Sequence, residues 1–440
     1  MKKTTDFPLL TPISLNEMES YFDRLWPICR SISGNGLRQS FEILQELIPL
    51  ELKEYPTGME VFDWEIPKEW NIREAYIITP DGEKICDFQL NNLHIVNYSI
   101  PFEGELTWDE LKEHIYTLPQ QPDAVPYITS YYKETWGFCM DFNTHERISK
   151  NGTFKIKIDS DLKPGSITVG SVVLKGNTDE EILLSTYLCH PSMANNELSG
   201  PLCMAYLYQQ IKAIPNRRYT YRFVVAPETI GVIAYLFDHG KQMKAKTKGG
   251  FVMTCCGDEA PFVFKQSKNP KGWLEKITTH VLKHHQAPHS IIPFAVGGSD
   301  ERQYCSPGFN LPVGSITRSM YHRYAQYHTS LDNKDFISFS AMSNSVGLYY
   351  NIIQTMEDNV TPICLIPFGE PRMGKRNLLP SSIEPNDKRR KDIDRMFHLI
   401  CWSDGEHDLI DIAEKREETP MDYRSILERL IEEEIIALHG

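Results

Sequence analysis

The sequence has no apolar run that approaches the roughly 20 residues needed to span a bilayer. Its first residues, Met1 to Asp6, carry charges with no apolar core behind them, so no secretory signal is predicted. Cysteine is also sparse: the ten cysteines are spaced neither as a disulfide framework nor as a CxxC zinc knot. These absences predict a cytoplasmic protein without a membrane anchor, with buried free thiols.

Two common catalytic signatures are missing as well, namely the Gly-x-Ser-x-Gly nucleophile motif and a glycine-rich phosphate loop. Acidic residues outnumber basic ones: the net charge is −13, which disfavours a general nucleic-acid binder. What remains is the composition of a globular protein, with 41% hydrophobic residues in 440. A chain of this length predicts two or three domains.

The chain changes character along its length. Ser14 with Glu17 forms a capping-box pattern, and two helices are expected between Ser14 and Leu50. Residues 56–149 are rich in proline, aromatic residues and short β-like runs, which favours an inserted β-rich domain with one helix, Trp108 to Tyr116. Long loops of the main domain are the alternative, but nearly a hundred structureless residues would be unusual.

Strands and helices alternate from Phe154 to Asn359. The expected strands are Ile182–Leu188, Tyr221–Ala226, Gly250–Cys256, Ser290–Phe294 and Val313–Thr317, and the expected helices are Gly200–Ile214, Gly231–His239, Gly272–His285 and Ser338–Met356. Continuous apolar strands separated by helices predict an α/β fold whose mixed sheet is covered on both faces.

Three domains are therefore expected. A discontinuous main domain takes residues 1–55 and 150–360, the insertion takes 56–149, and a C-terminal module takes 361–440. The module follows a proline-rich connector, 362–385, and its three short helices resemble a winged helix.

Imidazoles and carboxylates follow several of the apolar strands. His190, Glu228, Asp258 and His328 each come after a different strand, at the edge where sites assemble in open α/β sheets. This composition suits zinc. Each residue also has a plain structural interpretation: a hydrogen-bonded loop histidine, a helix cap, or a turn former beside a glycine.

The order of these motifs resembles the zinc exopeptidases of the leucyl-aminopeptidase and glutaminyl-cyclase type. The matching stretches are His190, Asn196-Glu197-Leu198-Ser199-Gly200, Glu228-Thr229-Ile230-Gly231, Asp258, Gly298-Ser299-Asp300-Glu301 and His328-Thr329-Ser330-Leu331-Asp332. The resemblance implies a zinc-exopeptidase-like fold and a zinc-dependent hydrolase that cleaves an amide or peptide-like bond of a small substrate.

The whole chain also resembles a bacterial family with an aminopeptidase-like domain, a nested extra domain and a C-terminal winged helix. The stretches that carry this resemblance are Arg30-Ser31-Ile32-Ser33-Gly34, Val61-Phe62-Asp63-Trp64, Asn91-Asn92-Leu93-His94 and Ser130-Tyr131-Tyr132-Lys133. The family often accompanies polysaccharide-biosynthesis genes, so the resemblance also implies a role in that setting.

The chain departs from the exopeptidase pattern at two acids. Asn196 stands where a bridging aspartate is expected, and Thr229 replaces the second glutamate. These losses favour one zinc ion, or none, over a pair. The resemblance implies His190, Glu197, His328 and Asp258 as metal ligands and Glu228 as general base.

Other residues are expected around the metal. Asn196 is an alternative, weak ligand to Glu197, and Asp258 and Asp300 could instead orient the imidazoles. Arg318, Arg323 and Tyr324 could hold an anionic group of the substrate, with a solvated loop as the alternative. Cys189 precedes His190, but neighbours on a strand point to opposite faces, which argues against a Cys–His dyad.

The C-terminal module is acidic, with 9 Lys and Arg against 15 Asp and Glu from residue 387 to 440. Such a surface repels phosphates, so DNA binding is not expected, and docking within the chain or onto another protein is. A homo-oligomer is compatible with the sequence. Two rivals to the hydrolase remain: an inactive aminopeptidase-fold binding protein in polysaccharide biosynthesis, and a winged-helix regulator, which the acidic third helix disfavours.

Overall fold

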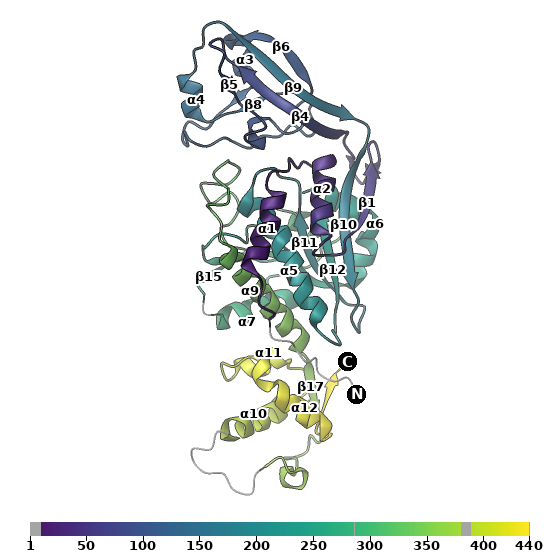
Figure 1. Cartoon of the computed structure of the whole chain (residues 1–440). Coiled ribbons are helices and arrows are strands. Elements are labelled where there is room, and N and C mark those ends of the chain that lie inside the picture. The colour runs from purple at the N-terminus through teal and green to yellow at the C-terminus, as the bar shows by residue number, and fades with distance from the viewer. Residues whose placement is uncertain (1–9, 286, 380–388, 440) are drawn as a thin grey trace.

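The computed structural model describes residues 10–285, 287–379 and 389–439, so the first residues and part of the expected connector lie outside it. Three parts lie one above another in Figure 1: the inserted segment at the top, an α/β domain in the middle and the C-terminal module below. Among the described residues, no helix combines the length and apolar character needed to cross a membrane.

The α/β domain is built on an eight-stranded mixed sheet in the order β1-β10-β12-β11-β13-β16-β14-β15. The strands are β1 (Glu51–Pro56), β10 (Ser166–Leu174), β11 (Glu181–Tyr187), β12 (Thr220–Ala226), β13 (Thr247–Val252), β14 (Phe262–Lys265), β15 (His289–Ile292) and β16 (Val313–Thr317). The neighbours β12, β11, β13 and β16 run parallel, whereas β1, β10 and β14 pair antiparallel to β10, β12 and β16. The predicted mixed sheet is confirmed.

Helices cover both faces of this sheet. One face packs against α1 (Leu15–Leu25), α2 (Asn35–Leu44), α5 (Ser199–Ala213), α7 (Trp273–His284) and α9 (Phe339–Asp358), and the other against α6 (Ile230–Lys246) and α8 (Glu301–Tyr304). In β11, Ile182 and Leu184 enter the first core and Leu183 the second, which explains the continuous apolar run. Each such buried side chain contributes about 1.5–3 kcal/mol.

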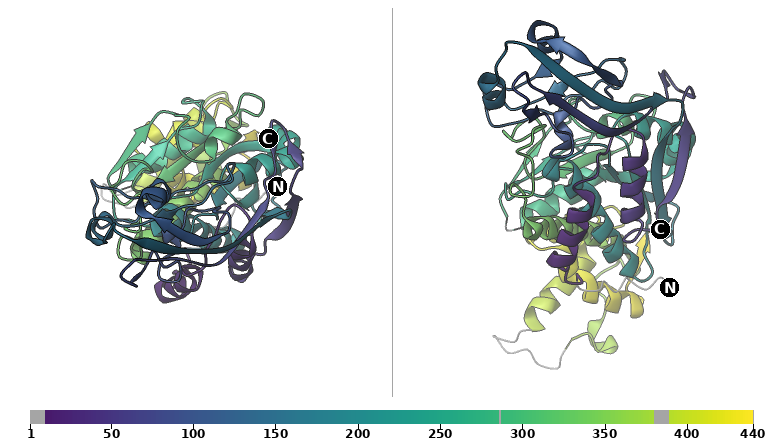
Figure 2. Two further views of the ribbon diagram at one scale, coloured as in Figure 1. Left: turned by 90° about the horizontal axis from the view of Figure 1, so that it is seen from above. Right: turned by 45° about the horizontal axis from the view of Figure 1, so that its top comes forward.

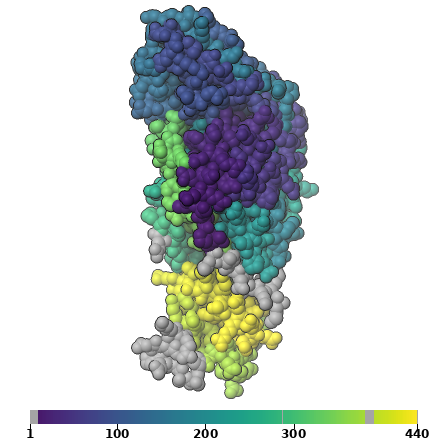
Figure 3. Space-filling model, in the orientation of Figure 1, coloured from purple at the N-terminus to yellow at the C-terminus, as the bar shows by residue number. Residues whose placement is uncertain are grey.

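The N-terminal helices lie side by side on the first face, in purple in Figures 2 and 3. The backbone N–H of Glu17 donates to Ser14 Oγ at 3.3 Å, so Ser14 caps α1 as its sequence pattern predicts.

The inserted segment holds a four-stranded antiparallel sheet in the order β5-β4-β9-β6. Its elements are β2 (Glu60–Val61), β3 (Trp64–Glu65), β4 (Glu69–Ile78), β5 (Lys84–Ile85), β6 (Phe102–Thr107), α3 (Trp108–Leu111), β7 (Ile115–Tyr116), β8 (Phe138–Cys139), α4 (Phe142–Arg147) and β9 (Thr153–Lys163). Because β9 pairs with β4 and β6, the inserted sheet extends to Lys163, beyond the boundary at 149 drawn from proline content. The expected helix 108–116 is shorter and passes into a 3-10 turn and β7.

The C-terminal module contains α10 (Arg389–Trp402), α11 (Leu409–Glu414) and α12 (Arg424–Glu432), with β17 (Thr361–Cys364) paired antiparallel to β18 (Ile436–His439). It contacts the main domain through Ile410, which belongs to the first core, and through polar side chains. Lys276 of α7 reaches Asp408 and Asp411 at 2.7 Å each. Arg424 pairs with Asp358 at the end of α9.

Candidate active site

A cavity of about 540 Å³ lies at the carboxyl ends of β11 and β12, where sites form in open α/β sheets. Its walls come from the main domain and from the insertion: Ile32, Trp64, Tyr127, Ile128, Thr129, Tyr131, Tyr132, Cys189, His190, Glu228, Thr229, Arg302 and His328. Three of the four residues that the sequence places at strand ends therefore meet in one hollow.

His190 follows β11 and is fixed from two sides. Its Nδ1 donates to Glu197 Oε2 at 2.7 Å, and the other oxygen of Glu197 accepts the N–H of Cys189. The buried Arg30 donates from Nε to the His190 carbonyl at 3.2 Å. These bonds set the tautomer and leave Nε2, which lies 3.6 Å from Glu228 Oε2, without a proton in the neutral ring.

Glu197 reaches His190 because the chain after β11 makes a short π-helical turn, Ala194–Leu198. The carboxylate of Asp332 accepts the N–H groups of Asn195 at 2.6 Å and Asn196 at 2.9 Å, and its carbonyl accepts that of Ala194. An anion at the start of a helical turn satisfies N–H groups that would otherwise lack partners. Asp332 thus acts as the cap of a turn that belongs to a distant segment.

Gly200 lets this turn lie against β13. A Cβ at this position would meet the Met253 carbonyl at 2.4 Å, so the glycine of the sequence motif is a packing requirement.

Glu228 precedes a strained bend. Thr229 has φ +65° and ψ −78°, and the N–H of Ile230 donates to the Glu228 carbonyl at 2.8 Å, which makes a γ-turn of the rare kind. A β-branched residue seldom adopts this conformation, and such strain collects at functional sites. Asp300 Oδ1 accepts the Thr229 N–H at 2.7 Å, and Arg302 donates to Thr229 Oγ1 at 2.9 Å.

His328 enters the cavity from the loop after β16 with a left-handed backbone, φ +55°. Its carbonyl accepts the N–H of Tyr127 at 2.9 Å, so the insertion holds it in place. Its ring centre lies 5.4 Å from that of His190 and 3.9 Å from that of Tyr327. Within the described chain, His328 Nε2 is buried and has no hydrogen-bond partner.

Burial and charge shift several groups of the site. Burial alone would lower the pKa of His190, but Cys189, Tyr127 and the Glu197 carboxylate outweigh it and raise that pKa well above its usual value, so without a bound metal the ring is protonated on both nitrogens. Burial raises the pKa of Glu228, although His190 and Arg302 pull it down. Burial and the Glu228 carboxylate raise the pKa of Asp300 well above its usual range.

His328 and Cys189 are shifted too. Burial, with His190 and His322 nearby, lowers the pKa of His328 to about 2, so its ring is neutral. Burial raises the pKa of the Cys189 thiol to about 11. Cys189 Sγ lies 3.4 Å from His190 Nδ1, so the argument that the two side chains point apart is wrong. The reason is that both residues follow β11 instead of lying in it, and the thiol stays protonated.

The four predicted ligands do not all lie together. His190 and Glu197 offer ligand atoms that, with that of Cys189, lie within 4.8 Å of one another, and His328 shares the cavity with His190. Asp258 does not line the cavity: Oδ2 accepts Asn195 Nδ2 at 2.7 Å and the Ser319 N–H at 3.0 Å. It therefore braces the loop, as its turn-forming alternative suggests.

Asn196 and the expected anion-binding residues also have definite places. Asn196 donates from Nδ2 to Tyr187 Oη at 2.6 Å, and its buried Oδ1 has no partner in the part of the chain described. Arg318 is buried elsewhere, where it donates to the Ala260 and Ala341 carbonyls at 3.2 Å each. Arg323 is exposed and Tyr324 Oη donates to Asp332 at 3.3 Å. None of these three residues, which the sequence proposed for binding an anionic group, lines the cavity.

Sequence reasoning missed the aromatic rim and the cation of the cavity. Trp64 and Tyr132, 38% and 59% exposed, lie edge to face with ring centres 5.5 Å apart. Both belong to stretches that carry the family resemblance, and that was the available signal. Arg302 gave no such signal, because it lies within a helix and is exposed.

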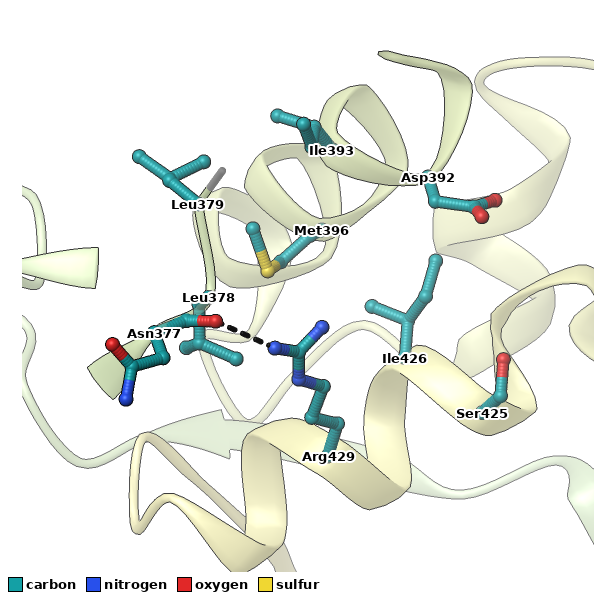
Figure 4. Close-up of a pocket in the computed structure, with 9 residues that line it drawn as sticks. All are labelled: Asn377, Leu378, Leu379, Asp392, Ile393, Met396, Ser425, Ile426 and Arg429. Atoms are coloured by element: carbon teal, nitrogen blue, oxygen red, sulfur yellow. Dashed lines mark hydrogen bonds between the residues drawn. The ribbon is translucent and has the colours of Figure 1, made fainter. Parts of the chain in front are cut away.

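A second cavity, of about 440 Å³, lies in the C-terminal module (Figure 4). Mostly apolar residues line it, and Arg429 donates to the Asn377 carbonyl at 2.8 Å across its wall. The cavity brings together no set of imidazoles or carboxylates.

Comparison with known proteins agrees with this architecture. Residues 20–359 match the family model described as "Domain of unknown function (DUF4910)", and residues 360–438 match a winged helix-turn-helix model. A Clostridium acetobutylicum protein described as a polysaccharide biosynthesis protein with an aminopeptidase-like domain is 41% identical over 410 residues, 93% of each chain.

Solved structures give the same picture. A Clostridium acetobutylicum protein described as a peptidase aligns with TM-score 0.89 at 39% identity, over 97% of this chain and 96% of that one. The zinc aminopeptidase of Bacillus subtilis aligns with TM-score 0.57 at 12% identity, over 79% of this chain and 95% of its own. At that identity the likeness shows the fold alone. The chain thus has an aminopeptidase-like domain with a C-terminal winged helix, and it belongs to the DUF4910 family.

Proposed function

We propose that the protein is a zinc-dependent hydrolase that cleaves an amide or peptide-like bond of a small substrate. One observation carries the proposal: two imidazoles, His190 and His328, share a cavity with a carboxylate, Glu228, that lies 3.6 Å from His190 Nε2. Two imidazoles that can hold a metal ion and a carboxylate that can act as the base are the groups that metal-assisted hydrolysis uses.

The residues present fit a zinc ion. His190 Nδ1 is held by Glu197, as the rings of metal-ligating histidines are held by carboxylates, so Nε2 is the ligand atom and a bound ion would displace its proton. His328 Nε2 and Asn196 Oδ1 are buried without partners among the described residues. His190 and His328 would hold the ion, with Glu197 orienting His190 from the opposite ring nitrogen, Nδ1. When bound, zinc lowers the pKa of water to about 7 and polarises a carbonyl.

Glu228 and Asp300 would move the proton. The two carboxyl groups influence each other's pKa, and Asp300 Oδ2 is buried with no hydrogen bond in the described structure. A proton on Asp300 suits such an atom, and it leaves Glu228 as the ionised partner. Glu228 takes a proton from the attacking water and returns it to the leaving nitrogen, while the γ-turn at Thr229 fixes its position.

The rim of the cavity suggests the kind of substrate. Trp64, Tyr131 and Tyr132 offer flat apolar faces, and Arg302 offers a positive charge beside Glu228. The 41% identical relative is described as a polysaccharide biosynthesis protein. We therefore favour an amide on an acylated amino sugar that carries a negative charge, such as a nucleotide-linked precursor.

Metal content and hydrolysis test the proposal together. Protein purified without an affinity tag should contain metal that His190→Ala removes, and it should cleave members of a panel of N-acylated amino sugars and aminoacyl p-nitroanilides. Metal without turnover across the panel would support the rival function, an inactive aminopeptidase-fold binding protein. If the His190→Ala change does not alter zinc binding, both the proposed zinc site and the proposed hydrolase function are contradicted.

The C-terminal module has contacts within the chain that suit intramolecular docking, through Lys276 and Arg424. We propose no role in DNA binding, because residues 387–440 are acidic. A gel shift with duplex DNA at physiological salt should show no binding by the full chain. Salt-sensitive binding to DNA would support the alternative function, a winged-helix regulator.

A further inference from the structure

A second group of histidines and a carboxylate lies between the main domain and the C-terminal module, away from the cavity. His280 and His284 lie one turn apart on α7, and Glu414 closes α11. His280 Nδ1 is 2.5 Å and His284 Nε2 is 3.4 Å from the same oxygen, Glu414 Oε1. One ligand atom from each residue lies within 4.8 Å of the others.

We propose that these three residues form a zinc site that clamps the winged-helix module onto the aminopeptidase-like domain. Two histidines four residues apart on a helix present their rings on one face, and a carboxylate from a facing element completes a common three-ligand zinc set. Water would take the fourth position. The two ligating elements belong to different domains, so a bound ion would link them directly.

The side chains are arranged to receive an ion. His284 Nε2 is a buried atom with no hydrogen-bond partner in the described structure, and it faces Glu414. The side chain of His280 is 3% exposed and that of Glu414 28%, so the ligands are partly shielded from water. Lys283 contacts the other oxygen of Glu414, Oε2, and leaves Oε1 to the two rings.

Two neighbouring features bear on this site: a groove beside the ligands and the ion pairs of Lys276. A groove of about 510 Å³ is lined by His280 and Glu414, together with Lys271, Lys276 and Lys283, so two of the three ligands border open space. Lys276 lies one turn earlier on α7 and already joins α11 through Asp408 and Asp411. The metal would extend this polar contact by bonds that depend less on salt than ion pairs between exposed residues do.

Zinc titration of the full chain tests the site. Metal-free, untagged protein is titrated with ZnCl₂ by calorimetry and by thermal unfolding, as wild type, His284→Ala, Glu414→Gln and His285→Ala. His285 is the matched control, because it is next in sequence but packs on Phe262 at 5.8 Å between ring centres instead of facing Glu414. We expect His284→Ala and Glu414→Gln to weaken one binding event by about 10-fold or more, and His285→Ala to leave it unchanged.

The same titration in a His190→Ala background separates this site from the cavity. The clamp site should keep its zinc affinity there, and zinc should still raise the unfolding midpoint. Zinc binding that survives in His284→Ala and Glu414→Gln but disappears with His190→Ala would overturn the clamp and leave the proposed hydrolase untouched. Equal weakening by His285→Ala would overturn it as well. Glu414→Gln preserves side-chain shape, so it decides the question if His284→Ala unfolds.

Discussion

Two clusters of imidazole and carboxylate in the described part of the chain are built in different ways. At the cavity, the Glu197 carboxylate is fully buried and both of its oxygens accept hydrogen bonds, from His190 and Cys189. At the domain contact, Glu414 is 28% exposed and shares its charge with an exposed lysine, Lys283. A rigid, desolvated cluster positions reacting groups, whereas a half-exposed one between two domains can serve to join them.

The largest effect that this comparison predicts concerns turnover. Glu228→Gln removes the proton acceptor beside His190 and should lower kcat by about 10²–10⁴-fold on whichever substrate of the panel is cleaved. His284→Ala should leave kcat unchanged, because its cluster takes no part in the chemistry. Steady-state rates and circular dichroism of both variants check this. Equal rates for Glu228→Gln and wild type would remove Glu228 from the mechanism.

The next effect concerns metal at the cavity. Glu197→Gln keeps the shape of the side chain but removes the charge that holds His190 Nδ1, so zinc affinity there should fall about 10–100-fold. Glu259→Gln is the control: Glu259 is exposed, so this change should leave the zinc affinity unaltered. Competition with a fluorescent chelator gives both affinities. A loss as complete as that of His328→Ala would instead favour direct ligation by Glu197.

A smaller effect is expected on stability. Asp332→Asn turns one of the two acceptors for the Asn195 and Asn196 N–H groups into a donor, which should cost about 1–3 kcal/mol of unfolding free energy. In metal-free protein, Glu414→Gln should cost about 1 kcal/mol or less, as partly exposed ion pairs do. Urea unfolding measures both. A larger loss of unfolding free energy in Glu414→Gln than in Asp332→Asn would mean that the domain contact, and not the cavity, is the more rigid cluster.

The smallest effect separates two arginines. Arg323 is exposed, so Arg323→Ala should change stability by no more than about 0.5 kcal/mol and leave the KM for an anionic substrate unaltered. Arg302→Ala should raise that KM several-fold, because Arg302 lines the cavity. Kinetics with charged and neutral members of one substrate series distinguish the two. A raised KM in Arg323→Ala but not in Arg302→Ala would support the sequence-based prediction that Arg323 binds an anionic group of the substrate.

Local patterns predicted the elements and the edge of the sheet, but not the contacts between distant segments. β16 runs over the residues expected, Val313–Thr317, because its β-branched residues lie between Pro312 and the charged Arg318. Strand ends likewise led to His190, Glu228 and His328. The bond from Tyr127 to the His328 carbonyl could not be predicted, since it joins a loop of the insertion to a loop of the main domain.

The same limit explains the errors at the site. Asp258 and Arg318 follow strands as the ligands do, and only their partners, Asn195 and the Ala260 and Ala341 carbonyls, show that they brace loops. The direction of Glu197 depends on a π-helical turn whose N–H groups are held by Asp332. Neither periodicity nor motif order encodes such a turn.

The ends of the insertion are direct neighbours in the main sheet: Pro56 of β1 lies opposite Ser166 of β10. The whole insertion could therefore be replaced by a short hairpin turn with little change to the main sheet. Such a deletion would, however, remove Trp64, Tyr127, Tyr131 and Tyr132 from the cavity and release His328. Evolution can thus replace the part that selects the ligand while the scaffold that carries the chemistry is inherited unchanged.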